Sequence, residues 1–127
     1  MSNPCDRITD AELQILKVLW AQDGAMTGSG IISAVSAVTA WNPSTIKTLI
    51  RRLQSKDALA VEQREVMHYT ARISEADFSE HQTARLIDTF YSGKVANLIS
   101  ALYDQKQIGP DDLEELRRRM EEGKGHE

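Results

Sequence analysis

Residues 42–56 read NPSTIKTLIRRLQSK, which is the pattern of an amphipathic helix with a clear start. Asn42 is a good N-cap, and Pro43 follows at the first helical position, where its missing N–H costs nothing. Apolar side chains then recur at intervals of three and four residues, at Ile46, Leu49, Ile50 and Leu53. The opposite side carries hydroxyls and long cations, and no acidic residue occurs between Asn42 and Lys56. The stretch therefore predicts a helix with one buried side and one basic side.

Two helices are predicted before this stretch. Thr9–Ala21 begins with Thr9 as cap and Glu12 three residues later, the two halves of a capping box. Asp23-Gly24 then interrupts the pattern. Thr27–Val38 has Thr27 as cap and an apolar side of its own, so a second helix follows. The basic helix is therefore the third of three.

Two β-prone segments follow the third helix, Leu59–Arg64 and Met67–Ile73, and they predict an antiparallel hairpin. The connection, Glu65-Val66, lacks the Asn-Gly or Asp-Gly pair of the commonest tight hairpin turns. Three helices followed directly by a hairpin are the layout of a winged helix-turn-helix. In such a domain the third helix enters the DNA major groove and the hairpin, or wing, lies along the backbone.

The rest of the chain is predicted to be helical. Apolar periodicity and glycine or proline breaks give helices over Ser74–Ser92, Lys94–Tyr103 and Asp111–Glu122. We therefore expect a mainly α protein. Its predicted parts are a winged-helix DNA-binding domain over 1–73, a C-terminal helical dimerisation domain over 74–122, and a disordered tail over 123–127.

The charge distribution supports a DNA-reading third helix. The 127 residues carry a net charge of −4, which argues against a protein that coats nucleic acid with its whole surface. Residues 42–72, however, hold six basic and three acidic side chains, a net +3, whereas 1–41 and 73–127 have −2 and −5. One basic face on an acidic body is expected where a single surface meets phosphate.

The candidate DNA-binding residues follow from this geometry. N-terminal residues of a recognition helix reach base edges, so the candidate readers are Ser44, Lys47, Thr48 and Arg51. Arg52 and Lys56 are expected to meet phosphates, and Arg64 and His68 are candidates near the tip of the wing.

Several segments resemble a known family. They are residues 8–12 (ITDAE) through 19–20 (LW), residues 44–53 (STIKTLIRRL) and residues 112–116 (DLEEL). Over about residues 8–122 the chain resembles the penicillinase and methicillin-resistance repressors, the BlaI/MecI family, which also includes the copper-transport repressor. The resemblance implies a homodimeric repressor whose N-terminal winged helix binds a palindromic operator and whose C-terminal helices hold the dimer together. It also implies that Lys47 and Thr48 read bases, with Ser44, Thr45, Arg51 and Arg52 beside them.

A dimer interface is also expected because three helices over about 50 residues cannot bury a good core alone. We look for it at five apolar residues: Leu98, Leu102, Leu113, Leu116 and Met120. The alternative is that these residues pack on their own winged helix.

The inducing signal is not given by the resemblance. Family members that respond to a β-lactam sensor protease of the membrane are cleaved at an Asn-Phe bond, and the corresponding place here reads Ala101-Leu102. Cleavage is therefore either absent or of different specificity. The copper-responsive branch has a Cys-x-Cys tail that this chain lacks, which excludes metal sensing by that route.

Other classes of function are less well supported. The three histidines have no metal-ligand spacing, and the chain has no nucleophile elbow, P-loop or dinucleotide fingerprint, so we expect no enzyme, metal or cofactor. A winged helix used for protein interaction remains an alternative. A ligand-responsive repressor of another winged-helix family is a further one, with a small molecule bound between the two halves.

The sequence also predicts a cytoplasmic protein without membrane insertion. It has no apolar run of 18 residues, and charged residues interrupt the first 20 positions where a signal peptide needs an apolar segment. The single cysteine, Cys5, fits a reducing compartment, and we interpret it as a bystander thiol near a frayed terminus.

Overall fold

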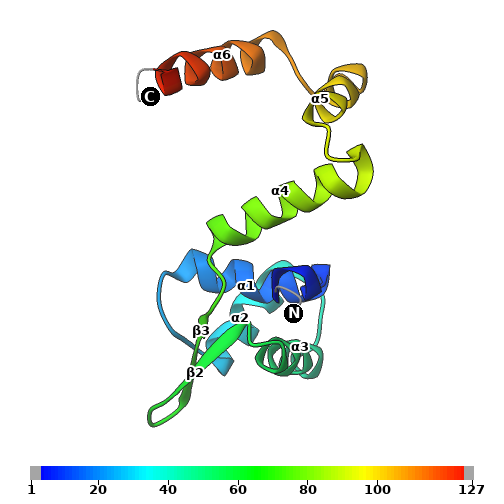
Figure 1. Ribbon diagram of the computed structural model, residues 1–127. Coiled ribbons are helices and arrows are strands. Elements are labelled where there is room, and N and C mark those ends of the chain that lie inside the picture. The colour runs from blue at the N-terminus through cyan, green and yellow to red at the C-terminus, as the bar shows by residue number, and fades with distance from the viewer. Residues whose placement is uncertain (1–3, 125–127) are drawn as a thin grey trace. The chain divides into compact units, whose positions relative to one another are not determined.

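A computed structural model describes residues 4–124 of the chain (Figure 1). Over these residues the elements in chain order are a 3-10 helix η1 (Pro4–Arg7), α1 (Asp10–Gln22), β1 (Met26–Thr27), α2 (Gly28–Val38), α3 (Pro43–Ser55), β2 (Leu59–Gln63), β3 (Met67–Ala71), α4 (Glu75–Tyr91), α5 (Val95–Asp104) and α6 (Pro110–Lys124). Three helices followed by a hairpin confirm the predicted winged helix-turn-helix.

The predicted helix starts are confirmed at atomic detail. Thr9 Oγ1 accepts the Glu12 amide at 3.2 Å, and the Glu12 carboxylate accepts the Thr9 amide at 2.8 Å, which completes the capping box. Thr27 Oγ1 accepts the Gly30 amide at 3.0 Å. Asn42 Oδ1 accepts the Thr45 amide at 3.0 Å. Each cap satisfies an amide that has no partner within its own helix, and so fixes where the helix begins.

The wing belongs to a small three-stranded antiparallel sheet with strand order β1-β3-β2. β2 pairs with β3 from Leu59 opposite Ala71 to Gln63 opposite Met67, which confirms the expected hairpin. β1 was not expected, because a strand of two residues has no period to detect. It pairs Met26 with Tyr69 and so ties the start of α2 to the wing.

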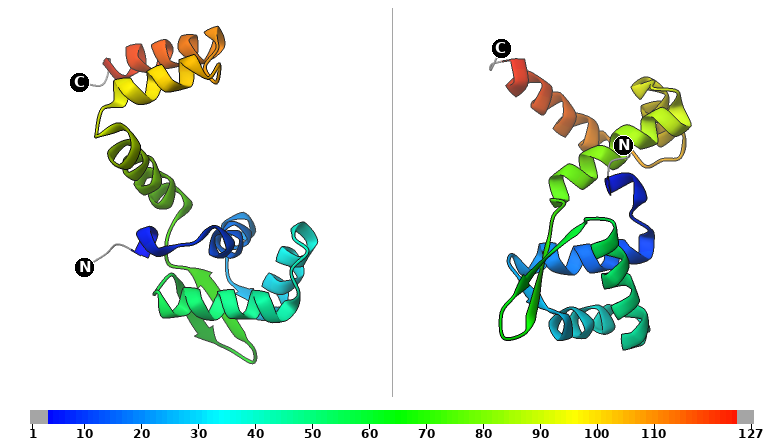
Figure 2. Two further views of the ribbon diagram at one scale, coloured as in Figure 1. Left: turned by 90° about the vertical axis from the view of Figure 1, so that its right-hand side faces the viewer. Right: turned by 60° about the horizontal axis from the view of Figure 1, so that its bottom comes forward.

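The core of the N-terminal part lies between α1, α2 and α3, which Figure 2 shows packed together with the hairpin beside α3. The four apolar residues predicted for the third helix, Ile46, Leu49, Ile50 and Leu53, are all buried. Trp20 joins this core to the start of α4: its Nε1 donates to the Ile73 carbonyl at 2.8 Å, and its ring lies 5.8 Å from that of Phe78.

The chain divides into two compact units within α4, residues 1–83 and 84–127, ten residues later than the boundary expected at 73/74. The first turns of α4 stay with the N-terminal unit because Phe78 is buried there, and because Gln82 Nε2 donates to the Cys5 carbonyl at 3.1 Å. His81 also hydrogen-bonds Asp6. The sequence pattern predicts where α4 begins, but it does not show which turns of α4 pack on the N-terminal unit. The boundary between the two units was therefore placed at the start of the helix.

Two expectations about the termini need correction. Cys5 is not a residue of a frayed end: it lies in η1, is 5% exposed and belongs to the core. Burial and the nearby Asp6 and Asp77 carboxylates raise the pKa of its thiol, which makes it a poor nucleophile. At the other end, Gly123 and Lys124 continue α6 instead of starting a disordered tail, and residues 125–127 lie outside the described part.

The C-terminal unit contains the rest of α4 together with α5 and α6. Its helices keep many apolar side chains exposed, among them Leu86, Phe90, Val95, Ile99, Tyr103, Leu113, Leu116 and Met120. Of the residues expected at the dimer interface, Leu113, Leu116 and Met120 are exposed, whereas Leu98 and Leu102 are half-buried. Over residues 4–124, no helix has the length and apolar character needed to cross a membrane.

Candidate nucleic-acid interface

The outer side of α3 presents most of the predicted reading residues to solvent. Ser44, Thr45, Lys47, Arg51 and Arg52 are exposed, and Thr48 is half-buried. This follows from the helical period, because burial of Ile46, Leu49, Ile50 and Leu53 turns the intervening positions outward.

The hydroxyl groups on this side are held in place by the helix itself. Ser44 Oγ and Thr45 Oγ1 donate to Asn42 Oδ1 at 2.6 and 3.3 Å, and Thr48 Oγ1 donates to the Ser44 carbonyl at 3.0 Å. Their oxygen lone pairs and the Thr48 methyl group are the parts left for a base edge. A hydroxyl with a fixed orientation costs less entropy when it binds.

Three cations of α3 are not neutralised by the fold. Within residues 4–124, no carboxylate forms a salt bridge with Lys47, Arg51 or Arg52. The arginines of α6, by contrast, are paired along their own helix, as Arg117 is with Glu114 at 2.6 Å. The positive charge of α3 therefore remains available to an anionic partner.

Lys56 differs from these cations, and the expectation that it meets phosphate is not supported by its position. Its Nζ donates to both carboxylate oxygens of Glu12, at 2.6 and 2.8 Å, and to the Arg7 carbonyl at 2.7 Å. These bonds use all three of its donors. Lys56 thus ties the end of α3 to the start of α1, and sequence reasoning missed this role because Glu12 lies 44 residues away.

The carboxylate of Glu12 is fully buried, yet it is held in the charged form. Burial raises its pKa, but hydrogen bonds from Lys56 and Thr9 outweigh that effect and lower the pKa below the ordinary 4.5. Among the described side chains Glu12 is the one charged residue in the buried set.

We predict that this carboxylate makes stability depend on pH. A carboxyl with a lowered pKa contributes stability above its unfolded pKa of about 4.5, and this contribution is lost as the pH falls through the lower folded pKa. The free energy of unfolding, measured with urea from about pH 7 to pH 3, should fall below pH 4.5 more steeply in the native chain than in Glu12→Gln. Glu65→Gln is the control, because Glu65 is exposed and, within residues 4–124, forms no salt bridge. Parallel curves for the native chain and Glu12→Gln would contradict the prediction.

The wing carries less free positive charge than the sequence implied. Arg64 is paired with Glu62 at 3.0 Å, and the exposed Glu65 follows it. The Arg64 hydrogen bond and charge lower the pKa of Glu62, so this pair stays charged near neutrality. His68 is half-buried, and its Nδ1 lies 2.9 Å from the Val66 carbonyl. The structure brings Arg64 and His68 to the wing, with Arg64 in a salt bridge to Glu62 and the His68 ring beside the Val66 carbonyl.

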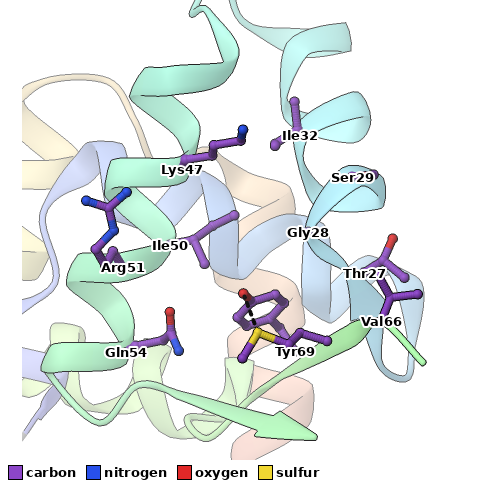
Figure 3. A pocket seen from close by; sticks show the side chains of 11 residues that line it. Thr27, Gly28, Ser29, Ile32, Lys47, Ile50, Arg51, Gln54, Val66 and Tyr69 are labelled. Carbon is purple, nitrogen blue, oxygen red and sulfur yellow. Dashed lines mark hydrogen bonds between the residues drawn. The ribbon is translucent and has the colours of Figure 1, made fainter. Parts of the chain in front are cut away.

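A groove of about 430 Å³ lies between the start of α2, α3 and the wing (Figure 3). We call it the α2–α3 groove; it is lined by Ile32, Lys47, Ile50, Gln54, Met67 and Tyr69, among others. Sequence reasoning missed the share of α2 and Tyr69 in this surface, because it depends on packing between α2, α3 and the wing, including the pairing of Met26 with Tyr69. Over residues 4–124, no group of three or more His, Cys, Asp and Glu side chains is placed to hold a metal ion.

Comparison with known proteins gives the family. A family model described as "Penicillinase repressor" matches residues 8–122. The chain belongs to the penicillinase repressor family. This confirms the resemblance inferred from the sequence. The family description names a repressor, not an enzyme, in agreement with the expected class.

Individual relatives of this penicillinase repressor family member are similar over nearly their whole length. The penicillinase repressor of Bacillus licheniformis is 31% identical over 119 residues, which cover 93% of this chain and 92% of the relative. The methicillin resistance regulatory protein MecI of Staphylococcus aureus (strain N315) is 26% identical over 118 residues, which cover 92% and 95%.

Two solved structures share the fold. The solution structure of the DNA-binding domain of the repressor BlaI has a TM-score of 0.52 and 35% identity, and covers 61% of this chain and 93% of that one. The solution structure of the monomeric form of Bacillus licheniformis BlaI in complex with the blaP half-operator has a TM-score of 0.50 and 36% identity, and covers 56% and 87%. Both support assignment of the fold as a winged-helix DNA-binding domain.

Proposed function

We propose that this penicillinase repressor family member is a sequence-specific transcriptional repressor that binds a palindromic operator in double-stranded DNA as a homodimer. One observation carries the proposal: α3 presents three unpaired cations and a set of oriented hydroxyls on the exposed side of a winged helix. The relative BlaI binds a half-operator, which supports the same partner for this chain.

In this proposal α3 lies in the major groove. Lys47 and Arg51 donate to guanine O6 and N7, and Thr48 offers its methyl group to thymine or its oxygen to a donor. Arg52 meets a phosphate. The Asn42 cap, which holds the Thr45 amide, fixes the start of α3, and the N-terminal residues of a recognition helix are the ones that contact base edges.

The homodimer is proposed from the exposed apolar side chains of the C-terminal unit. Leu113, Leu116 and Met120 share one side of α6, and all are about half exposed in the single chain. Apolar patches that a monomer leaves open mark interaction surfaces. A dimer would place two α3 helices in successive major grooves on a palindrome and block access to a promoter.

Release is proposed to occur through the C-terminal unit, by way of a membrane sensor protease or another signal. The Ala101-Leu102 bond, which corresponds to the family's cleavage position, is half-buried inside α5. A protease therefore requires α5 to open locally before cutting. We place the repressor in the cytoplasm with its operator. Antibiotic-resistance genes are the proposed targets, because the relatives are named for penicillinase and methicillin resistance.

A double substitution tests this function. Lys47→Ala with Thr48→Ala should weaken specific operator binding by about 2–6 kcal/mol, since each good base contact gives roughly 1–3 kcal/mol. The duplex is selected by the native protein from a random-sequence pool, and affinities are measured by fluorescence anisotropy at one salt concentration. Binding to a scrambled duplex should change much less.

The matched control is Lys17→Ala with Thr83→Ala. Lys17 is an exposed cation of α1, and Thr83 donates to the Ser79 carbonyl at 2.9 Å, the same bond that Thr48 makes within α3. The control should bind like the native chain. Equal binding by the Lys47/Thr48 variant and this control would refute the assignment of α3 as the reading helix.

A further inference from the structure

The α2–α3 groove combines an apolar wall with a cation. Ile32 and Ile50 face each other across it from α2 and α3, and the ring of Tyr69 lies at its lower end (Figure 3). The Tyr69 hydroxyl lies 4.0 Å from Met67 Sδ, so these two side chains lie together on the wing side. Lys47 extends from α3 over the groove toward Ile32, whereas the guanidinium of Arg51 turns to the other side of α3 (Figure 3).

The charge of this groove has one sign. No Asp or Glu is among its lining residues, and within residues 4–124 Lys47 makes no salt bridge. α2 begins at the groove with Gly28, so the positive end of its dipole adds to the charge of Lys47. Gln54 supplies a neutral donor and acceptor on the same wall. A ligand that complements this groove therefore needs one anionic group, to meet the positive charge, and an apolar part beside it.

The size of the groove fits a small molecule. At about 430 Å³ it falls within the roughly 300–1,000 Å³ of ligand sites, which are mostly apolar with a few placed polar groups. A molecule with an aromatic or short aliphatic part and one carboxylate fits both features of the groove. Its apolar part would contact Ile32, Ile50 and Tyr69, and its carboxylate would pair with Lys47.

We propose that the α2–α3 groove is a binding site for a small amphipathic carboxylate, and that its occupancy excludes DNA. Lys47 is also the proposed reader of bases, so a ligand that fills the groove would take the space beside Lys47 that a base edge needs, and its carboxylate would neutralise the charge that attracts DNA. The ligand would therefore act as a direct competitor at the reading helix, without any step in the C-terminal unit. The competition rests on the proposed function, while binding of the carboxylate does not.

Binding is tested first without DNA, on the full ¹⁵N-labelled chain, by NMR titration with 3-phenylpropionate. Its neutral analogue, 3-phenylpropionamide, is the matched ligand. The carboxylate should shift the amide signals of Gly28, Ile32, Lys47 and Tyr69, with a dissociation constant of about 1 mM for so small a probe. The amide should bind at least about tenfold more weakly.

Three variants locate the site. Lys47→Met and Ile32→Ala should each weaken 3-phenylpropionate binding, the first by about tenfold and the second by about threefold to tenfold. Lys17→Met removes an exposed cation elsewhere and should leave binding unchanged. Equal binding of acid and amide, or unchanged binding by Lys47→Met, would overturn the site. So would shifts produced by a short non-specific DNA duplex but not by the carboxylate, which would make the groove part of the DNA surface alone.

Competition is tested second, with the selected duplex. At a probe concentration of ten times its dissociation constant, each α3 should lose about tenfold, so the affinity of the proposed dimer for the operator should fall by about 10²-fold, and the amide at the same concentration should have little effect. Unchanged affinity with the groove occupied would overturn the competition. If the native chain fails to bind any selected duplex, the proposed function fails instead, and the NMR result still decides the site.

Discussion

Replacing Lys56 by methionine is expected to lower the free energy of unfolding by about 3–5 kcal/mol, because it leaves the Glu12 carboxylate buried without a cation. Glu12 has no exposed surface, and the Lys56 ammonium supplies bonds to both of its oxygens, at 2.6 and 2.8 Å. Methionine preserves most of the apolar stem of the lysine. The loss therefore reports the charge and hydrogen bonds and not a cavity.

The same ion pair predicts an asymmetry between its two partners. Glu12→Gln should cost only about 1–2 kcal/mol, because it leaves the ammonium of Lys56 with its bond to the Arg7 carbonyl and with access to water, at 24% exposure. The double variant, Glu12→Gln with Lys56→Met, should be more stable than Lys56→Met alone, since no buried charge is then left unpaired.

Urea unfolding at pH 7 and one fixed protein concentration measures these differences, through the midpoint and the slope of each transition. Lys17→Met is the control, because Lys17 is an exposed lysine of α1 and its loss should change stability by less than about 0.5 kcal/mol. A Lys56→Met variant no less stable than Glu12→Gln would show that the carboxylate finds another partner or water.

Much of the N-terminal fold follows from local sequence signals. Thr9, Thr27 and Asn42 were predicted as caps from residue type and position, and each accepts the expected amide. The buried side of α3 follows from spacing alone. These features are predictable because capping and helical periodicity act over three or four residues, within the range that a single sequence reveals.

The features that sequence reasoning missed depend on contacts between distant residues. β1 has two residues and exists through its pairing with β3, about 40 positions later. Cys5 is buried although it lies near the N-terminus, because Gln82 and the start of α4 cover that segment. Lys56 has the residue type and position of a phosphate ligand, but the buried Glu12 takes its charge. A single sequence shows which side chains are charged, but not which charges the fold neutralises.

In the candidate site, too, features set by local sequence were predicted and features set by contacts between distant residues were missed. The exposed hydroxyls and cations of α3 were predicted from helical geometry, whereas the α2–α3 groove was not, because it is formed by three elements. The helix α5 was predicted from its apolar periodicity, yet the apolar side chains that it leaves exposed are Val95, Ile99 and Tyr103, whereas Leu98 and Leu102, which were expected at the dimer interface, are half-buried. Apolar periodicity shows which residues share one side of a helix, but not which of them remain exposed to solvent in the folded chain.

We expect that placing two carboxylates on the apolar side of α6 will separate the proposed dimer and weaken operator binding by about 10²–10⁴-fold. The variant is Leu116→Glu with Met120→Glu. Both positions are exposed in the single chain, at 47% and 60%, so the fold of one chain tolerates charge there. A dimer that buries them would have to desolvate four carboxylates, at a cost of several kcal/mol for each ion left unpaired.

The operator loss follows from linkage between the two half-sites. When one α3 of a dimer is bound, the other is held near its own half-site at an effective concentration in the millimolar range, which raises overall affinity by about 10²–10⁴-fold. A monomer loses this gain but keeps every contact of its own α3. The variant should therefore bind a full palindrome with about the affinity that it has for half of one, whereas the native chain should bind the palindrome far more tightly.

The matched control adds the same two charges to the C-terminal unit at polar, exposed positions of α5, with Asn97→Glu and Ser100→Glu. These residues lie opposite the apolar stripe of α5, so the control should remain a dimer and bind the palindrome like the native chain. Sedimentation velocity measures the oligomeric state, and fluorescence anisotropy measures both affinities at one salt concentration.

A Leu116/Met120 variant that sediments as the native dimer would place the interface on the exposed apolar sides of α4 and α5, around Phe90 and Tyr103. One that is monomeric yet still binds the palindrome at native affinity would refute linkage of the half-sites as the source of operator affinity.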